Sequence, residues 1–303
     1  MIDRRAFLRL PAAIALAGAA YSVAIEPNFR LEVTRYRVTP KDWPPALSLR
    51  IAVITDLHAC EPWMPSARIR RIAALANSLA PDLIVLLGDF AAGTHLVTGP
   101  VQPEQWAEAL SNLEAPLGVH AVLGNHDWWH GALPGDPSDG AEAARAALKQ
   151  MGARLYENDA MRLEKNGEPF WLLGLADQLA EWVQIGKRGR WRGRDDLDAT
   201  LARVIDDSPA ILLAHEPFVF DRVPGRVALT LSGHTHGGQV NLPVLGPIAA
   251  ELRYGGGSRV YGHYVQDGRH LVISGGLGES ILPMRFMRPP EIVEVTVAPP
   301  AAA

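Results

Sequence analysis

Short apolar runs separated by amphipathic segments recur along most of this 303-residue chain. Several runs are apolar throughout, which is typical of strands that are covered on both faces. They predict buried strands at Leu49–Thr55, Asp82–Leu87, Gly118–Leu123, Phe170–Leu175 and Ala210–Ala214.

Segments with helical periodicity lie between these runs. The first has Ser66 in the position of an N-cap, followed by apolar residues spaced to lie on one helix face, namely Ile69, Ile72, Ala73, Ala76 and Leu79. Further helices are predicted at Trp106–Leu113, Ala141–Met151 and Leu197–Ile205. Because strands and helices alternate, we predict a layered α/β core.

The C-terminal third has strand patterns without a convincing helix between them. Apolar runs at Val227–Leu231, Leu271–Ser274 and Ile292–Val297 are joined by Gly- and Pro-rich segments. Near the other end, Arg30–Val38 alternates apolar and polar residues and predicts an edge strand. We therefore expect a two-sheet sandwich with helices outside it, in one domain without an internal repeat.

The first twenty residues have the pattern of an export signal. Arg4 and Arg5 precede a short apolar run that ends in Ala17-Gly18-Ala19, and this run is too short to span a bilayer. The adjacent arginines resemble a twin-arginine signal, with Asp3 where Ser or Thr is usual. The protein is then expected to leave the cytoplasm folded through the twin-arginine machinery, for the periplasm or cell envelope.

The expected organisation has four parts. Residues 1–20 are the twin-arginine-like signal segment, residues 21–46 a leader strand with a Pro-rich connection, residues 47–298 the single domain, and residues 299–303 a tail.

Composition narrows the classes of function. A formal charge of −4 and a pI near 6.2 do not fit a general nucleic-acid binder, which normally carries a cationic excess. The single cysteine, Cys60, excludes an intramolecular disulfide and a cysteine-rich zinc module, and we expect it to be a small buried residue. Any metal ligands must be His, Asp, Glu or Asn side chains.

Five short polar segments each follow an apolar strand. They are Asp56-Leu57-His58, Gly88-Asp89, Gly124-Asn125-His126-Asp127, His215 and Gly233-His234-Thr235-His236. Strand carboxyl ends are where α/β folds gather functional groups, so we expect these segments to meet at one rim.

The side chains in these segments suit a pair of metal ions. The candidate ligands are imidazoles, two carboxylates and one amide, namely Asp56, His58, Asp89, Asn125, His215, His234 and His236. This mixed N/O set favours Mn²⁺, with Fe or Zn²⁺ as alternatives. Seven ligands are too many for one tetrahedral ion, but two divalent ions about 3.5–4 Å apart, sharing a carboxylate, would use them all. Such a site keeps residual positive charge and favours a phosphate-bearing substrate.

In this order, Asp-x-His, Gly-Asp, Gly-Asn-His-Asp, a lone His and Gly-His-x-His resemble the signature of calcineurin-like metallophosphoesterases. The strings from Leu231 to Val240 and from Gly276 to Glu291 are similar to the exported YkuE/YaeI-like branch of bacterial phosphodiesterases. The resemblance covers Leu47 to Val297 and implies a four-layer sandwich of two mixed β-sheets flanked by helices.

The resemblance also implies a role for each candidate residue. Asp56, His58 and His236 would hold one metal, Asn125, His215 and His234 the other, and Asp89 would bridge the two. His126 would protonate the leaving group and Asp127 would orient its imidazole. The attacking species would be a hydroxide that bridges the metals.

Hydrolysis of a phosphodiester is the expected function. The alternatives are a phosphomonoesterase or a lipid-linked pyrophosphatase with the same site, and a non-catalytic phosphate-binding scaffold. A nuclease is disfavoured because the chain lacks an extended cationic track.

One basic segment and several aromatic residues remain outside this pattern. Lys187–Arg194 carries five cationic residues around Trp191, and we interpret it as a solvated loop and candidate lid. It could instead hold a phosphorylated headgroup or rest on an anionic membrane surface. Trp63, Trp128 and Trp129 could line a substrate groove beside the metals or pack locally.

Overall fold

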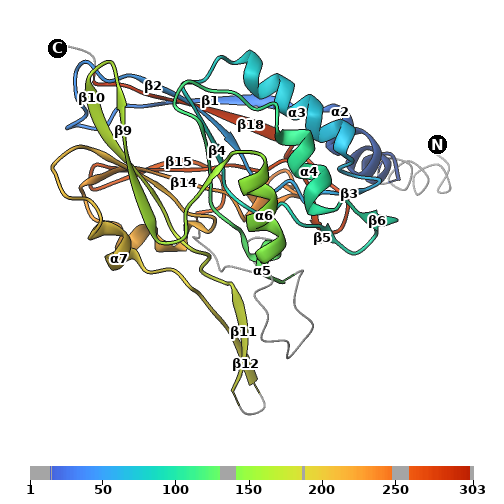
Figure 1. The fold of residues 1–303 in the computed structure, drawn as a ribbon. Helices are drawn as coiled ribbons and strands as arrows, with labels where there is room; N and C mark the ends of the chain where they lie inside the picture. The colour runs from blue at the N-terminus through green and yellow to red at the C-terminus, as the bar shows by residue number, and fades with distance from the viewer. Residues whose placement is uncertain (1–13, 15, 130–140, 186–187, 248–258, 301–303) are drawn as a thin grey trace.

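Two six-stranded sheets pack face to face in the computed structural model (Figure 1). The structure describes residues 14, 16–129, 141–185, 188–247 and 259–300. The first sheet has the order β1 (Glu32–Val38), β18 (Glu291–Val297), β2 (Leu49–Ile54), β4 (Leu83–Leu86), β7 (Val119–Ala121) and β8 (Arg154–Leu155). The second has the order β15 (Gly262–Gln266), β16 (Arg269–Ile273), β14 (Val227–Ser232), β13 (Ala210–Leu213), β10 (Glu168–Gly174) and β9 (Asp159–Lys165).

Both sheets are mixed. In the first, β2, β4, β7 and β8 run parallel, whereas β18 is antiparallel to β2. In the second, β10, β13, β14 and β16 run parallel, and the edge strands β9 and β15 are antiparallel to their neighbours. The carboxyl ends of several strands in each sheet therefore lie together, as predicted for a site-bearing rim.

Helices cover the outer face of each sheet. One group packs on the first sheet and consists of α3 (Ser66–Ser78), α4 (Pro103–Leu110) and α6 (Glu142–Gln150). The shorter α7 (Leu197–Leu201) and the 3₁₀ helix η2 (Pro217–Arg222) pack on the second. Ile51 and Val53 of β2 point into the core between the sheets, whereas Ala52 and Ile54 face the helices, because successive side chains of a strand alternate in direction. The predicted sandwich of two mixed sheets flanked by helices is confirmed.

Short elements complete the fold. They are the N-terminal π-helix η1 (Tyr21–Ile25) and α2 (Glu26–Phe29), the pairs β3 (Cys60–Glu61) with β6 (Gly99–Pro100) and β5 (Gly93–Thr94) with β17 (Ser280–Ile281), the hairpin β11 (Glu181–Ile185) with β12 (Arg188–Arg192), α5 (Asn125–Trp129) and the 3₁₀ turn η3 (His236–Gly238). None of the described helices is both long enough and apolar enough to cross a bilayer.

The two ends of the fold meet in the first sheet. β1 pairs in parallel with β18 from Glu32 opposite Glu291 to Val38 opposite Val297, and β18 lies between β1 and β2. β1 has one neighbour, so the prediction of an edge strand is confirmed. The segment before β1 is attached as well, because the buried Glu26 carboxylate accepts hydrogen bonds from the backbone N–H groups of Met287 and Arg288.

Three local predictions are wrong. Helix α3 begins at Ser66, with Pro65 in the N-cap position, and α7 ends at Leu201 instead of Ile205. Most of the supposed loop Lys187–Arg194 lies in the hairpin, where Trp182 and Trp191 form a cross-strand pair. The arginines implicated in export and His130, a further residue after the proposed catalytic loop, lie outside the described residues.

Candidate metal centre

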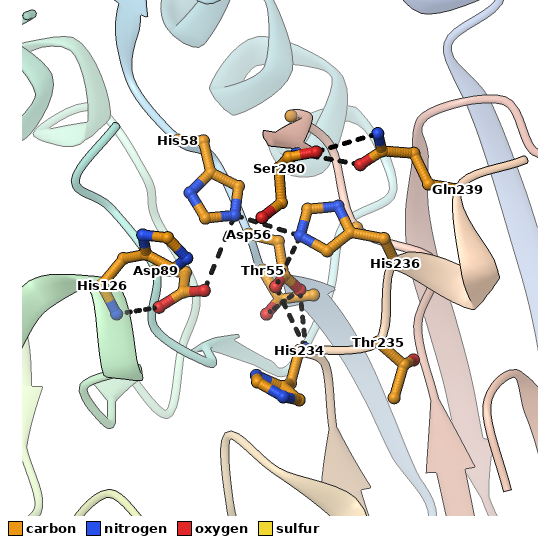
Figure 2. A network of polar contacts seen from close by, with 12 residues as sticks. Thr55, Asp56, His58, Asp89, His126, His234, Thr235, His236, Gln239 and Ser280 are labelled. Atoms are coloured by element: carbon orange, nitrogen blue, oxygen red, sulfur yellow. Dashed lines mark hydrogen bonds and ion pairs between the residues drawn. The ribbon is translucent and has the colours of Figure 1, made fainter. Parts of the chain in front are cut away.

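The five polar segments converge at one rim of the sandwich. The segments that begin at Asp56, Asp89 and Asn125 follow β2, β4 and β7 of the first sheet, and those with His215 and His234 follow β13 and β14 of the second. Figure 2 shows the side chains of four of these segments pointing toward one another. Strand order and direction therefore bring together groups that are far apart in the sequence.

Asp56, His58 and His236 form one buried group of candidate ligands. Nε2 of His236 lies 3.5 Å from Oδ1 of Asp56 and 3.0 Å from Nε2 of His58. The two imidazole rings are nearly parallel, with centroids 5.0 Å apart. Three donor atoms thus face a common point, as ligands of one ion do.

Asp89, His215 and His234 form a second buried group, and Asp89 lies between the two groups. Oδ2 of Asp89 lies 3.2 Å from Nε2 of His215 and 3.6 Å from Nε2 of His58. Oδ1 of Asn125 lies 2.8 Å from Nδ1 of His234. All seven candidate ligands are therefore in one cluster, with one carboxylate in contact with both halves.

Hydrogen bonds to the backbone fix the orientation of two imidazoles. Nδ1–H of His58 donates to the carbonyl oxygen of Ala91 at 2.9 Å, and Nδ1–H of His215 donates to that of Leu87 at 2.5 Å. Each bond directs the Nε2 atom into the cluster, which is how proteins orient metal-binding histidines. Among the described residues, His215 Nε2 and Asn125 Nδ2 are buried without a hydrogen-bond partner. The residues present fit a pair of divalent cations.

Burial and charge set the protonation of the cluster. Burial lowers the pKa of His236 well below its usual value, with a further lowering from His58, so this side chain is a neutral imidazole able to bind a metal. Burial would raise the pKa of Asp89, but the nearby His215 and His126 outweigh burial and hold that pKa well below its usual value. Asp89 is thus a carboxylate at neutral pH.

The Asp127 carboxylate is held by backbone donors. Its oxygens accept four backbone hydrogen bonds, of 2.8 to 3.0 Å, from the N–H groups of Gly124, Asp89, Phe90 and Ala91. An ionised carboxylate has about four sites that accept hydrogen bonds, and these four N–H groups match that number. Asp127 therefore joins the loop after β4 to the loop after β7, and its role in orienting the His126 imidazole stays a prediction.

His126 lies at the edge of the cluster. Its backbone N–H donates to Oδ1 of Asp89 at 2.8 Å, and its half-buried ring meets that of His58 edge-on at a centroid distance of 4.8 Å. On the other side it contacts Trp129, also at 4.8 Å. A partly accessible imidazole beside the cluster is suitably placed to reach a bound ester.

Close packing explains a glycine before one ligand. A β-carbon at Gly124 would lie 2.5 Å from the backbone nitrogen of Asp89 and 2.7 Å from Cε1 of His215. Such distances are shorter than any ordinary contact, so the loops can approach only because this residue has no side chain.

Two residues contact the ligands but received no role from the sequence. Thr55 Oγ1 donates to Oδ2 of Asp56 at 2.8 Å. Arg285 is fully buried, donates to the carbonyl oxygens of Gly275 and Gly278, and brings Nη2 to 3.4 Å from Nδ1 of His236. Thr55 directly precedes a ligand in the sequence, and Arg285 lies in the segment from Gly276 to Glu291 that carries the family resemblance, but the contact of Arg285 with His236 is long-range.

The aromatic residues expected near the metals differ in exposure. Trp128 is buried under the guanidinium groups of Arg145 and Arg194, so it cannot line a groove. Trp129 is half-buried beside His126, and Trp63 donates from Nε1 to the carbonyl oxygen of Leu96. Cys60 is buried, as predicted.

Comparison with known proteins agrees with this fold and site. The family model described as calcineurin-like phosphoesterase matches residues 49–238, so the chain belongs to the calcineurin-like phosphoesterase family. Members of this family depend on a dinuclear metal centre, and the two groups around Asp89 are candidate ligands for it.

Relatives span nearly the whole chain. The uncharacterized metallophosphoesterase YkuE of Bacillus subtilis (strain 168) is 30% identical over 310 residues, which cover 98% of each chain. The UDP-2,3-diacylglucosamine pyrophosphatase LpxG of Chlamydia muridarum is 29% identical over 308 residues, covering 88% of this chain and 89% of LpxG. Among solved structures, the NAD nucleotidase NadN of Haemophilus influenzae matches 76% of this chain and 51% of its own, with a TM-score of 0.48 and 14% identity.

Proposed function

We propose that the protein hydrolyses phosphodiester bonds with two divalent cations, most favourably Mn²⁺. The observation that supports this most directly is the position of Asp89, whose Oδ2 approaches a histidine of each ligand group. Asp56, His58 and His236 would hold one cation, and Asn125, His215 and His234 the other, with Asp89 shared between them. When bound, the two cations supply positive charge to the phosphate oxygens and activate water for attack.

The protein's own side chains then orient the metal ligands and protonate the leaving group. The Nδ1–H bonds of His58 and His215 to the backbone hold their rings in place, so that the cluster is organised before a substrate arrives. His126 would donate a proton to the departing oxygen, which avoids the release of a free alkoxide. Asp127 would keep the two loops that carry Asp89 and His126 at a fixed separation.

Hydrolysis of a chromogenic diester beside its monoester tests this proposal. Protein loaded with Mn²⁺ is expected to cleave bis(4-nitrophenyl) phosphate faster than 4-nitrophenyl phosphate, and Asp89→Asn is expected to lose both activities. Preference for the monoester would instead support a phosphomonoesterase. Two bound metals without hydrolysis of either compound would support a phosphate-binding scaffold.

A lipid-linked pyrophosphatase is the second candidate. It is favoured by the LpxG relatives, which are named as pyrophosphatases of a diacylated sugar nucleotide and align with 88% of this chain. Mass spectrometry of products from a lipid-linked diphosphate would show cleavage between the two phosphorus atoms in that case.

Export of the folded protein by the twin-arginine route is the proposed localisation. It is supported by Arg4 and Arg5 before the short apolar run. Replacing both by lysine is expected to retain the protein in the cytoplasm, whereas unchanged export would remove this proposal.

A further inference from the structure

The hairpin of β11 and β12 projects from the body of the protein (Figure 1). It carries two tryptophans on one face. Trp182 and Trp191 are a cross-strand pair with ring centroids 4.9 Å apart. They are 55% and 39% exposed, respectively. The ring of Trp182 lies across Gly189 and leaves no room there for a β-carbon. Large apolar rings are thus held on the strands at the protein surface.

This aromatic surface continues to the metal centre. The ring of Trp191 stacks on Trp129, with centroids 4.2 Å apart and planes 20° apart. Trp129 is anchored by a hydrogen bond from Nε1 to the carbonyl oxygen of Leu179 and contacts His126 on its other side. A row of rings therefore connects the exposed hairpin to the edge of the candidate metal centre.

The same hairpin is cationic. Residues 181–194 contain five Lys or Arg residues and one Glu, a local charge of +4 in a chain whose net charge is −4. Glu181 pairs with Arg192 and Arg194. Arg190 lies opposite Val183 in the register, on the face away from the tryptophan pair, and is exposed. Positive charge is thus concentrated on the element that also presents exposed tryptophans.

We propose that the β11–β12 hairpin docks on the surface of an anionic lipid bilayer. Tryptophan favours the boundary between lipid headgroups and acyl chains, because one end of the indole is apolar and the other can donate a hydrogen bond. The arginines lie on the other face of the same two strands, and a hairpin immersed in the headgroup layer exposes both faces to anionic headgroups, an attraction that salt weakens. A single-stranded nucleic acid could also stack its bases on exposed rings, but a long polyanion needs an extended cationic track, which this chain of net charge −4 lacks.

Docking in this way would hold the metal centre close to the membrane. The row of rings from Trp182 through Trp191 and Trp129 to His126 would bridge the distance between the bilayer and the site. The inference does not depend on which phosphate bond is cleaved, because membrane binding can be measured on metal-free protein.

Vesicle flotation in EDTA tests the proposal. The full chain, with residues 1–20 the same in every sample, is mixed with vesicles of phosphatidylcholine alone, or of phosphatidylcholine with 30% phosphatidylglycerol. The protein is expected to float with the anionic vesicles, to a smaller extent with the neutral ones, and to be released by about 0.5 M salt because of charge screening. Equal binding to both compositions would overturn the role of the cationic residues.

Paired variants identify the surface. Trp182→Ala is expected to weaken binding on the order of tenfold, because roughly half of a large aromatic surface is no longer buried in lipid. Arg190→Gln is expected to weaken it about fivefold, the effect of one arginine near an anionic membrane. The matched controls are Val265→Ala, at a 60% exposed position on β15, and Arg37→Gln, at an exposed position on β1.

The outcomes distinguish a lipid bilayer from a polyanion as the binding partner of the hairpin. Thermal unfolding midpoints equal to that of the parent protein would show that the variants are folded. Unchanged vesicle binding by folded Trp182→Ala and Arg190→Gln would overturn the proposal, as would retention on heparin without binding to vesicles. Loss of vesicle binding with normal diester hydrolysis supports docking, whereas absence of hydrolysis in protein that still binds vesicles counts only against the proposed function.

Discussion

The Asp127 carboxylate accepts a hydrogen bond from the backbone N–H of Asp89 at 2.9 Å, and the Asp89 carboxylate accepts one from the backbone N–H of His126 at 2.8 Å. The two loops are thus joined in both directions. Because the Asp89 carboxylate contacts a histidine ring of each ligand group, the spacing of the candidate metal sites depends on this connection.

Replacing Asp127 with asparagine tests that dependence. The amide has one acceptor oxygen and places an NH₂ group against backbone donors, so at least two of the four hydrogen bonds are lost. The free energy of unfolding should fall by about 2 to 5 kcal/mol, since each unpaired buried donor costs roughly 1 to 3 kcal/mol. Urea denaturation of metal-free protein measures this, with Asp207→Asn at an exposed position as the control. An unchanged midpoint would contradict the connecting role.

Replacing Asp89 with asparagine should change the metal content. The amide keeps the size of the side chain but removes the negative charge, so one shared ligand can no longer balance two cations. We expect fewer than two metals per chain and a loss of diester hydrolysis of at least ~100-fold. Elemental analysis after dialysis checks the first result, with the exposed Asp42→Asn as control. Two tightly bound metals in the variant would disprove the bridging assignment.

Replacing His126 with alanine should affect substrates unequally. A proton donor matters most when the leaving group is a strong base, so an alkyl phosphodiester should lose about 10²–10⁴-fold in rate. A 4-nitrophenyl diester, whose leaving group is stable without a proton, should lose much less, and metal content should be unchanged. Steady-state rates for both substrates, compared with the exposed His95→Ala, test the role. Equal losses on both would indicate that His126 acts in another way.

Replacing Gly124 with alanine should disrupt the candidate metal centre. The new β-carbon would overlap the Asp89 backbone and the His215 ring, and relief of such overpacking costs about 1 to 3 kcal/mol. We expect lower stability together with weaker metal binding, as measured by calorimetry. Gly99→Ala is the matched control, because a β-carbon at that position would have no other atom within 4 Å. Similar results for both variants would argue against a close approach at Gly124.

Acid should destabilise the fold partly through His120. Burial lowers the pKa of this histidine, whose Nε2–H donates to the Leu117 carbonyl oxygen and whose Nδ1 accepts from the Tyr156 hydroxyl. Below about pH 6.5 the His120 side chain binds a proton in the unfolded chain but stays neutral in the folded protein until the pH is lower. Its contribution to the free energy of unfolding is therefore present at neutral pH and is lost as the pH falls. His120→Gln should reduce the slope of unfolding free energy between pH 7 and pH 5, by at most ~1.4 kcal/mol per pH unit. The same measurement on His95→Gln, a substitution at an exposed position, is the control.

Much of the fold could be predicted because the buried strands carry a strong local signal. β2, β4 and β13 are nearly continuous apolar runs, and the polar residues that follow them mark where each strand ends. β9 was not predicted, because its exposed edge position permits a mixed sequence with little alternation. The sequence of Lys187–Arg194 predicts a loop instead of strand β12, because its glycines and arginines outweigh the short strand pattern around Trp191.

The composition of the candidate site could be predicted more fully than its connections. Ligand types and their order follow from short motifs, but the partners of Asp127 are backbone groups, which no side-chain pattern records. Arg285 is similar, since its contact with His236 depends on a chain reversal far along the sequence.

The pairing of β1 with β18 has a consequence for biosynthesis. A growing chain that has emerged only as far as β16 already contains every candidate metal ligand, yet the first sheet still lacks the strand between β1 and β2. The finished sheet can therefore form only after the ribosome has synthesised β18. Stalled or C-terminally truncated chains should consequently stay open and be degraded by cellular proteases before they can retain metal.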